Sequence, residues 1–70
     1  MKRKVNKLVE QRVCDVLRQI QMCGEQSLSN VISMAGTALG VERGLLTRTE
    51  KLGTTYYNLT EKGLIKLSSS

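Results

Sequence analysis

Apolar residues recur at helical spacing between positions 5 and 23 and form one continuous stripe: Val5, Val9, Val13, Val16, Leu17, Ile20 and Cys23. The pattern predicts a long amphipathic helix that must bury this stripe. A chain of 70 residues buries only about 60% of the surface of its unfolded form, so its own core is small. Because the stripe exceeds what so small a core needs, we expect this helix to carry the surface of a homodimer.

A second helix is predicted from 28 to 39. Gly24 can end the first helix, and the hydroxyl of Ser27 can cap a helix that begins at Leu28. Its expected buried stripe is Leu28, Val31, Ile32, Ala35, Ala38 and Leu39.

The opposite face of this helix is Ser29, Asn30, Ser33 and Thr37, flanked by Met34. This opposite face has no charge, which is unusual for a solvated surface. It suits close approach to base-pair edges, since Asn can pair with adenine and Met can contact a thymine methyl. Packing against a second copy of the chain is the alternative.

Gly40 and Gly44 are expected helix boundaries, and two β-prone runs follow at 45–50 and 54–59. The loop 51–53 between them contains Gly53, so the pair is expected to form a hairpin. Its core-facing residues would be Leu46, Tyr57 and Leu59, and its exposed residues Arg48, Lys51, Thr54 and Thr55. Thr60 can cap a last helix over 61–67, with Leu64 and Leu67 inward and 68–70 as a frayed tail. The predicted fold is therefore one α+β, mostly α domain over 1–70, with a basic arm at 1–4.

The formal net charge of +5 is large for this length and favours a polyanionic partner, although solubility alone would also explain it. The chain has no histidine and only Cys14 and Cys23, so we expect reduced thiols, no metal site, no cofactor and no enzymatic activity. No apolar run reaches the roughly 18 residues of a membrane span. We therefore expect a soluble protein of the cytoplasm.

The segment RGLLTRTEKLGTTYYNLTEKGL, residues 43–64, resembles the wing and following helix of winged helix-turn-helix proteins. The matching residues are Gly44-Leu45-Leu46-Thr47-Arg48 and then Tyr57-Asn58-Leu59-Thr60-Glu61-Lys62-Gly63. The resemblance covers about a third of the chain. The segment is similar to the bacterial and phage repressors, including the MarR-like and PadR-like groups.

The resemblance implies a small transcriptional regulator, a repressor of bacterial, phage or plasmid type, that binds double-stranded DNA at the nucleoid. Helix 28–39 would enter the major groove and the wing 45–59 would lie on the phosphate backbone. The expected DNA-binding residues are Ser29, Asn30, Ser33, Met34, Thr37, Arg43, Arg48, Lys51, Thr54 and Thr55, with Lys2, Arg3, Lys4 and Lys7. Three helices usually precede such a wing, whereas two are predicted here.

Three alternatives remain at this point. In a competing register, 28–35 is a scaffold helix, Gly36 is the turn and 37–52 is the recognition helix, which leaves no wing. The uncharged helix face also suits a winged-helix module that docks another protein. The basic, amphipathic N-terminus would also suit a helix lying on a membrane surface, although the absence of Trp and Phe argues against it.

Overall fold

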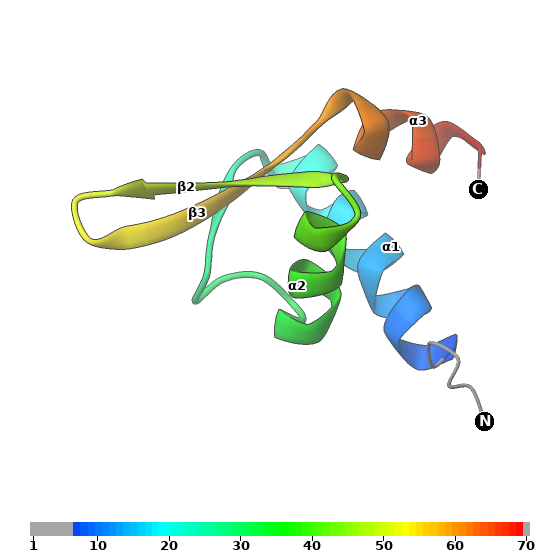
Figure 1. The fold of residues 1–70 in the computed structure, drawn as a ribbon, viewed down its shortest axis with the longest axis horizontal. Helices are drawn as coiled ribbons and strands as arrows, with labels where there is room; N and C mark the ends of the chain where they lie inside the picture. The colour runs from blue at the N-terminus through cyan, green and yellow to red at the C-terminus, as the bar shows by residue number, and fades with distance from the viewer. Residues whose placement is uncertain (1–6, 70) are drawn as a thin grey trace.

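The computed structural model describes residues 7–69 as three helices and a three-stranded antiparallel sheet, mostly helical. In chain order the elements are α1 (Lys7–Cys23), β1 (Gln26–Ser27), α2 (Met34–Glu42), β2 (Leu46–Lys51), β3 (Thr54–Leu59) and α3 (Glu61–Ser69). The strands are ordered β1-β3-β2. The hairpin β2–β3 projects away from the helices, while α1 and α2 lie together beneath the sheet (Figure 1).

The core forms where the stripe of α1 meets the base of the hairpin. Val13, Val16, Leu17 and Ile20 are buried together with Leu45, Leu46 and Tyr57. The predicted helix and most of its stripe are confirmed over the described residues, and Val5 lies outside them. Cys23 is exposed, contrary to prediction, because it is the last residue of α1 and the chain turns away at Gly24, whose φ is 88°.

The second helix begins six residues later than predicted. Gln26 and Ser27 pair with Tyr57 and Tyr56, and the Leu28 amide donates to the Thr55 carbonyl at 2.8 Å. This pairing commits the chain to a third strand, which was not predicted, so Ser27 cannot act as the helix cap. Residues 28–30 form only a turn, in which the Asn30 amide donates to the Ser27 carbonyl.

Ser33 is the residue that caps α2. Its backbone is extended, with φ −154° and ψ 120°, and its hydroxyl accepts a hydrogen bond from the Gly36 amide at 3.0 Å. The helix then continues through Gly40 to Glu42, and Gly44 follows with φ 77°. The boundary predicted at Gly40 is therefore wrong and the one at Gly44 is confirmed. The competing helix 37–52 is also wrong, because the chain has become strand by Leu46.

The buried face of α2 differs in part from the predicted one, although Leu39, and Val31 in the loop before the helix, pack against the core as predicted. Gly36, Thr37 and Gly40 are buried, whereas Ala35 and Ala38 are exposed. The cause is close contact with α1: a Cβ at Gly36 would lie 2.7 Å from the Arg12 backbone. Small residues are therefore needed on the face toward α1, and this need overrides the hydrophobic pattern. Leu28 and Ile32, also expected inside, are 37% and 56% exposed.

The hairpin follows the prediction closely. Leu46 and Tyr57 are buried, and Leu59 packs against the core. The strands are joined by a two-residue turn in which Leu52 has φ 49° and Gly53 has φ 79°. This left-handed conformation costs a residue other than glycine roughly 1–2 kcal/mol.

The cap of the last helix is confirmed, since the Thr60 hydroxyl accepts from the Gly63 amide at 3.0 Å and donates to the Gly44 carbonyl at 2.7 Å. Leu67 packs against the core, but Leu64 is 46% exposed, contrary to prediction. Gly63 is buried in its place because α3 lies directly against the Leu45 carbonyl. Residues 68 and 69 are helical rather than frayed, and residue 70 lies outside the described residues.

Candidate nucleic-acid interface

The exposed face of α2 is small and largely apolar. Because Gly36, Thr37 and Gly40 face inward, the residues left outside are Met34, Ala35, Ala38 and Glu42. Met34 is 64% exposed. Alanine side chains leave the helix backbone accessible to a close partner, and Glu42 places one negative charge at the C-terminal end.

Two of the residues expected to contact bases have structural roles instead. Thr37 is only 1% exposed, and its hydroxyl donates to the Ser33 carbonyl at 2.7 Å. The hydroxyl of Ser33 is occupied by the capping hydrogen bond. Neither side chain lies on the exposed face of α2, because the helix begins at Met34 and turns this side toward α1.

Ser29 and Asn30 lie instead in the loop that leads into α2, where both are exposed. This loop is held by Gln19 of α1, which the sequence did not single out. The Gln19 side-chain amide donates to the Asn30 carbonyl at 2.8 Å and accepts from the Ile32 amide at 2.9 Å. An amide on the polar face of a helix carries no sequence signal that distinguishes such a role from simple solvation.

Arg43 forms the strongest ion pair of the described chain. Its guanidinium donates two hydrogen bonds to the Glu10 carboxylate, at 2.8 and 2.6 Å, and joins the end of α2 to the start of α1. Hydrogen bonding to Arg43 holds the pKa of Glu10 below its usual range, despite the opposing effect of burial. The charge of Arg43 is thus already compensated within the fold.

The two cations of the hairpin differ in their surroundings. Lys51 forms an ion pair with Glu25 at 3.0 Å and lies 5.2 Å from the centre of the Tyr56 ring. Arg48 is exposed and forms no ion pair with residues 7–69. It stands opposite Tyr57, on the face of the sheet that covers the helices. Arg48 therefore extends on the same side of the sheet as α2, together with Glu50.

The remaining predicted contacts are divided between the hairpin and the N-terminus. Thr54 is exposed and Thr55 is half-buried. Lys7 is exposed at the first turn of α1, and Lys2, Arg3 and Lys4 lie outside the described residues. All six acidic residues but only eight of the eleven basic ones fall within 7–69. The described fold therefore carries +2 and the first six residues carry +3.

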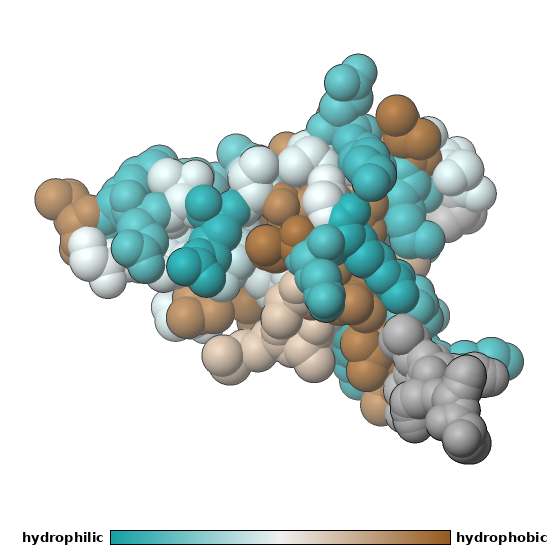
Figure 2. Space-filling model, in the orientation of Figure 1, coloured by the Kyte–Doolittle hydropathy of each residue, from teal (hydrophilic) through white to brown (hydrophobic). Residues whose placement is uncertain are grey.

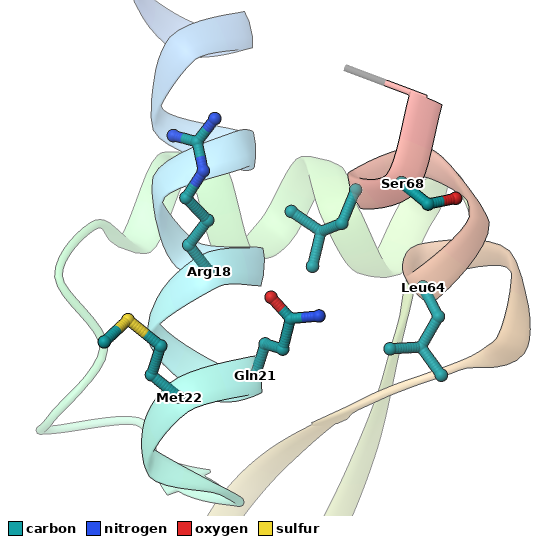
Figure 3. A pocket seen from close by; sticks show the side chains of 6 residues that line it. Arg18, Gln21, Met22, Leu64 and Ser68 are labelled. Atoms are coloured by element: carbon teal, nitrogen blue, oxygen red, sulfur yellow. The ribbon is translucent and has the colours of Figure 1, made fainter.

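A shallow groove separates α1 from α3 (Figure 3) and has a volume of about 200 Å³. It is lined by Arg18, Gln21, Met22, Leu64, Leu67 and Ser68. Ligand cavities usually occupy about 300–1,000 Å³, so this groove is small for one. Over residues 7–69 no cluster of three or more His, Cys, Asp or Glu side chains could hold a metal ion.

None of the helices described here has both the length and the apolar character needed to cross a bilayer. Comparisons with protein-family models, curated proteins and solved structures find no match to this chain. Its function must therefore be inferred from its own residues and their geometry.

Proposed function

We propose that this protein binds double-stranded DNA as a small winged-helix regulator, with α2 in the major groove and the β2–β3 hairpin as the wing. The observation that carries the proposal is the position of Arg48. It is a cation on a projecting hairpin that forms no ion pair with residues 7–69, and it lies on the same side of the sheet as α2. The major groove is about 12 Å wide and admits one α-helix. Ala35 and Ala38 would let α2 enter it deeply.

The proposed contacts differ from those expected from the sequence. Met34, Ala35 and Ala38 supply apolar contacts suited to thymine methyl groups, and Asn30 supplies an amide suited to adenine. Arg48 would contact a phosphate, as would the basic residues 2–4 of the N-terminal arm. With so few hydrogen-bonding groups near the bases, phosphate contacts would supply most of the affinity.

The regulatory role, repression and a place at the nucleoid belong to the same proposal. A single domain covers one half-site, so tight operator binding would require two copies one helical turn apart. A homodimer through α1 cannot use the buried stripe, which the monomer's own core occupies. It would use the exposed apolar residues near the ends of this helix, Leu8 and Met22, which are 57% and 84% exposed.

The test is a fluorescence-anisotropy titration of a duplex of about 20 base pairs at several salt concentrations. Roughly five phosphate contacts predict a slope of log affinity against log salt near −4 to −5. Ala38→Glu places a charge on the exposed face of α2 and should weaken binding at least tenfold, because the carboxylate would face the DNA. Gln21→Glu makes the same charge change on the exposed side of α1 and should have a much smaller effect. Equal affinities for the two variants would argue against α2 as the DNA-binding element.

A protein-docking function is the second candidate, and the apolar surface favours it. Ile32 and Met34 are 56% and 64% exposed beside Ala35 and Ala38. Figure 2 shows apolar colours over α2 and the loop before it. Docking through this surface would be nearly independent of salt, so the same titration separates the two functions.

A further inference from the structure

The tip of the hairpin carries an apolar side chain in an unfavourable backbone conformation. Leu52 has φ 49° and is 104% exposed, and Gly53 follows with φ 79°. Two-residue hairpin turns with both φ values positive strongly favour Asn-Gly or Asp-Gly. Leucine is thus poorly suited to this turn and gains nothing by burial.

Within residues 7–69 no packing contact offsets the conformational cost of Leu52, because its side chain is fully exposed. Residues held in such a conformation cluster at functional sites, where the strain serves binding. The same turn would form more readily with asparagine. The feature therefore points to a partner that Leu52 contacts outside the fold.

The surroundings of Leu52 indicate the kind of partner. Its neighbours at the tip are Lys51, Gly53 and Thr54, and the next exposed residue on the outer face of β2 is Thr49. A protein-docking site would place further apolar residues around such an anchor. The polar groups around Leu52 are hydroxyls and one lysine, whose ammonium group is paired with Glu25. A single apolar side chain among hydroxyl groups suits the sugar-phosphate walls of a DNA groove better than an apolar docking site. Of the acidic residues near the tip, Glu50 lies on the other face of β2, and Glu25 reaches the tip through its ion pair with Lys51.

We propose that Leu52 enters the minor groove of the duplex and partly unstacks one base step, which bends the DNA. This rests on the proposed function. The minor groove is about 6 Å wide, which admits a side chain but not a helix. The hairpin places its tip well beyond the helices (Figure 1), so the tip can reach a groove next to the one that α2 occupies. Apolar side chains inserted between base steps bend DNA by about 20–90°.

The experiment measures affinity and bending together. The probe is a duplex of about 20 base pairs with central TA steps, which unstack easily, carrying a donor and an acceptor dye at its ends. Wild type, Leu52→Asn and Leu52→Met are compared by anisotropy and by energy transfer, and their melting temperatures are measured. Leu52→Met keeps an apolar side chain and is the matched control.

We expect wild type and Leu52→Met to bind and to raise energy transfer. Leu52→Asn should bind about ten- to a hundredfold more weakly and leave energy transfer unchanged. Its melting temperature should nevertheless rise by roughly 5 °C, because asparagine tolerates the left-handed turn. A stability gain combined with a binding loss is not expected of a residue whose role is structural.

Three outcomes would overturn the inference. If wild type binds DNA without bending it, or if Leu52→Asn binds and bends as wild type does, Leu52 is not inserted and DNA binding itself still stands. If wild type binds no duplex at low salt, both the proposed function and this inference are wrong.

Discussion

Arg43 and Glu10 join the C-terminal end of α2 to the first turns of α1 through two hydrogen bonds of 2.8 and 2.6 Å. The residues are 33 positions apart in the sequence. The pair holds α2 and α1 together in addition to the close contact between Gly36 and the Arg12 backbone. It also has a measurable pH dependence.

Stability should fall in acid partly through this pair. The fold holds the pKa of Glu10 below its usual value, mainly through the hydrogen bond from Arg43. The pair therefore stabilises the fold above that usual value, and its contribution is lost as pH falls through the pKa of the folded state. We expect Glu10→Gln to melt lower than wild type near neutral pH and to lose less stability on acidification. Thermal melts between about pH 7 and about pH 3 test this, with Glu50→Gln as the control.

The cap of α2 can be tested by two serine variants. Ser33→Ala removes the acceptor of the Gly36 amide and should cost about 1 kcal/mol in the free energy of unfolding. Ser27→Ala removes only an exposed hydroxyl contact with Ser29 and should change stability by less than about 0.5 kcal/mol. Urea denaturation measures both. A larger loss for Ser27→Ala would mean that the helix begins at Leu28.

Gly36 and Gly40 should respond differently to alanine. A Cβ at Gly36 meets the backbone of Arg12 at 2.7 Å, so the helices must move apart. We expect Gly36→Ala to destabilise the fold by about 1–3 kcal/mol, despite the better helix propensity of alanine. A Cβ at Gly40 meets the tip of Leu46 at 2.9 Å, and this side chain can adjust. Gly40→Ala should therefore cost much less. Chemical denaturation giving equal losses would exclude close backbone contact at Gly36.

DNA affinity should depend on Arg48 more than on Lys51. Arg48→Ala removes a phosphate contact and should reduce the magnitude of the salt slope by about 1. Lys51 is already paired with Glu25, so Lys51→Ala should have a smaller effect. Arg18→Ala, which removes a cation of α1 paired with Asp15, is the charge-matched control. Equal losses in all three variants would indicate attraction by net charge alone.

The sequence predicted the parts of the fold that depend on nearby residues. The spacing of Val13, Val16, Leu17 and Ile20 defined α1 and its buried face. Gly24 and Thr60 marked a helix end and a helix start through local hydrogen bonds. The two β-prone runs at 45–50 and 54–59 and the glycine at 53 predicted the hairpin and its core-facing residues. Each of these features involves residues only a few positions apart.

The candidate site was predicted less well, because contacts between distant segments decide it. The sequence predicted an uncharged helix face before the hairpin. The hydroxyls of two of its residues, Ser33 and Thr37, form hydrogen bonds within α2 and its cap. Arg43 was expected to be available and is paired with Glu10. Gln19, which holds the loop before α2, was not identified. Arg48 is the cation of the hairpin whose exposure and lack of an ion pair, within 7–69, fit the role predicted for it.

The sequence by itself determined the long first helix, the hairpin and the cap of the last helix, because hydrophobic period, turn residues and capping hydroxyls act locally. The tertiary structure decided where α2 begins and which face it exposes. Pairing of β1 with β3 removes residues 26–28 from any helix, and close contact with α1 requires glycine at position 36. Both effects act between segments far apart in the chain, so no local pattern could reveal them.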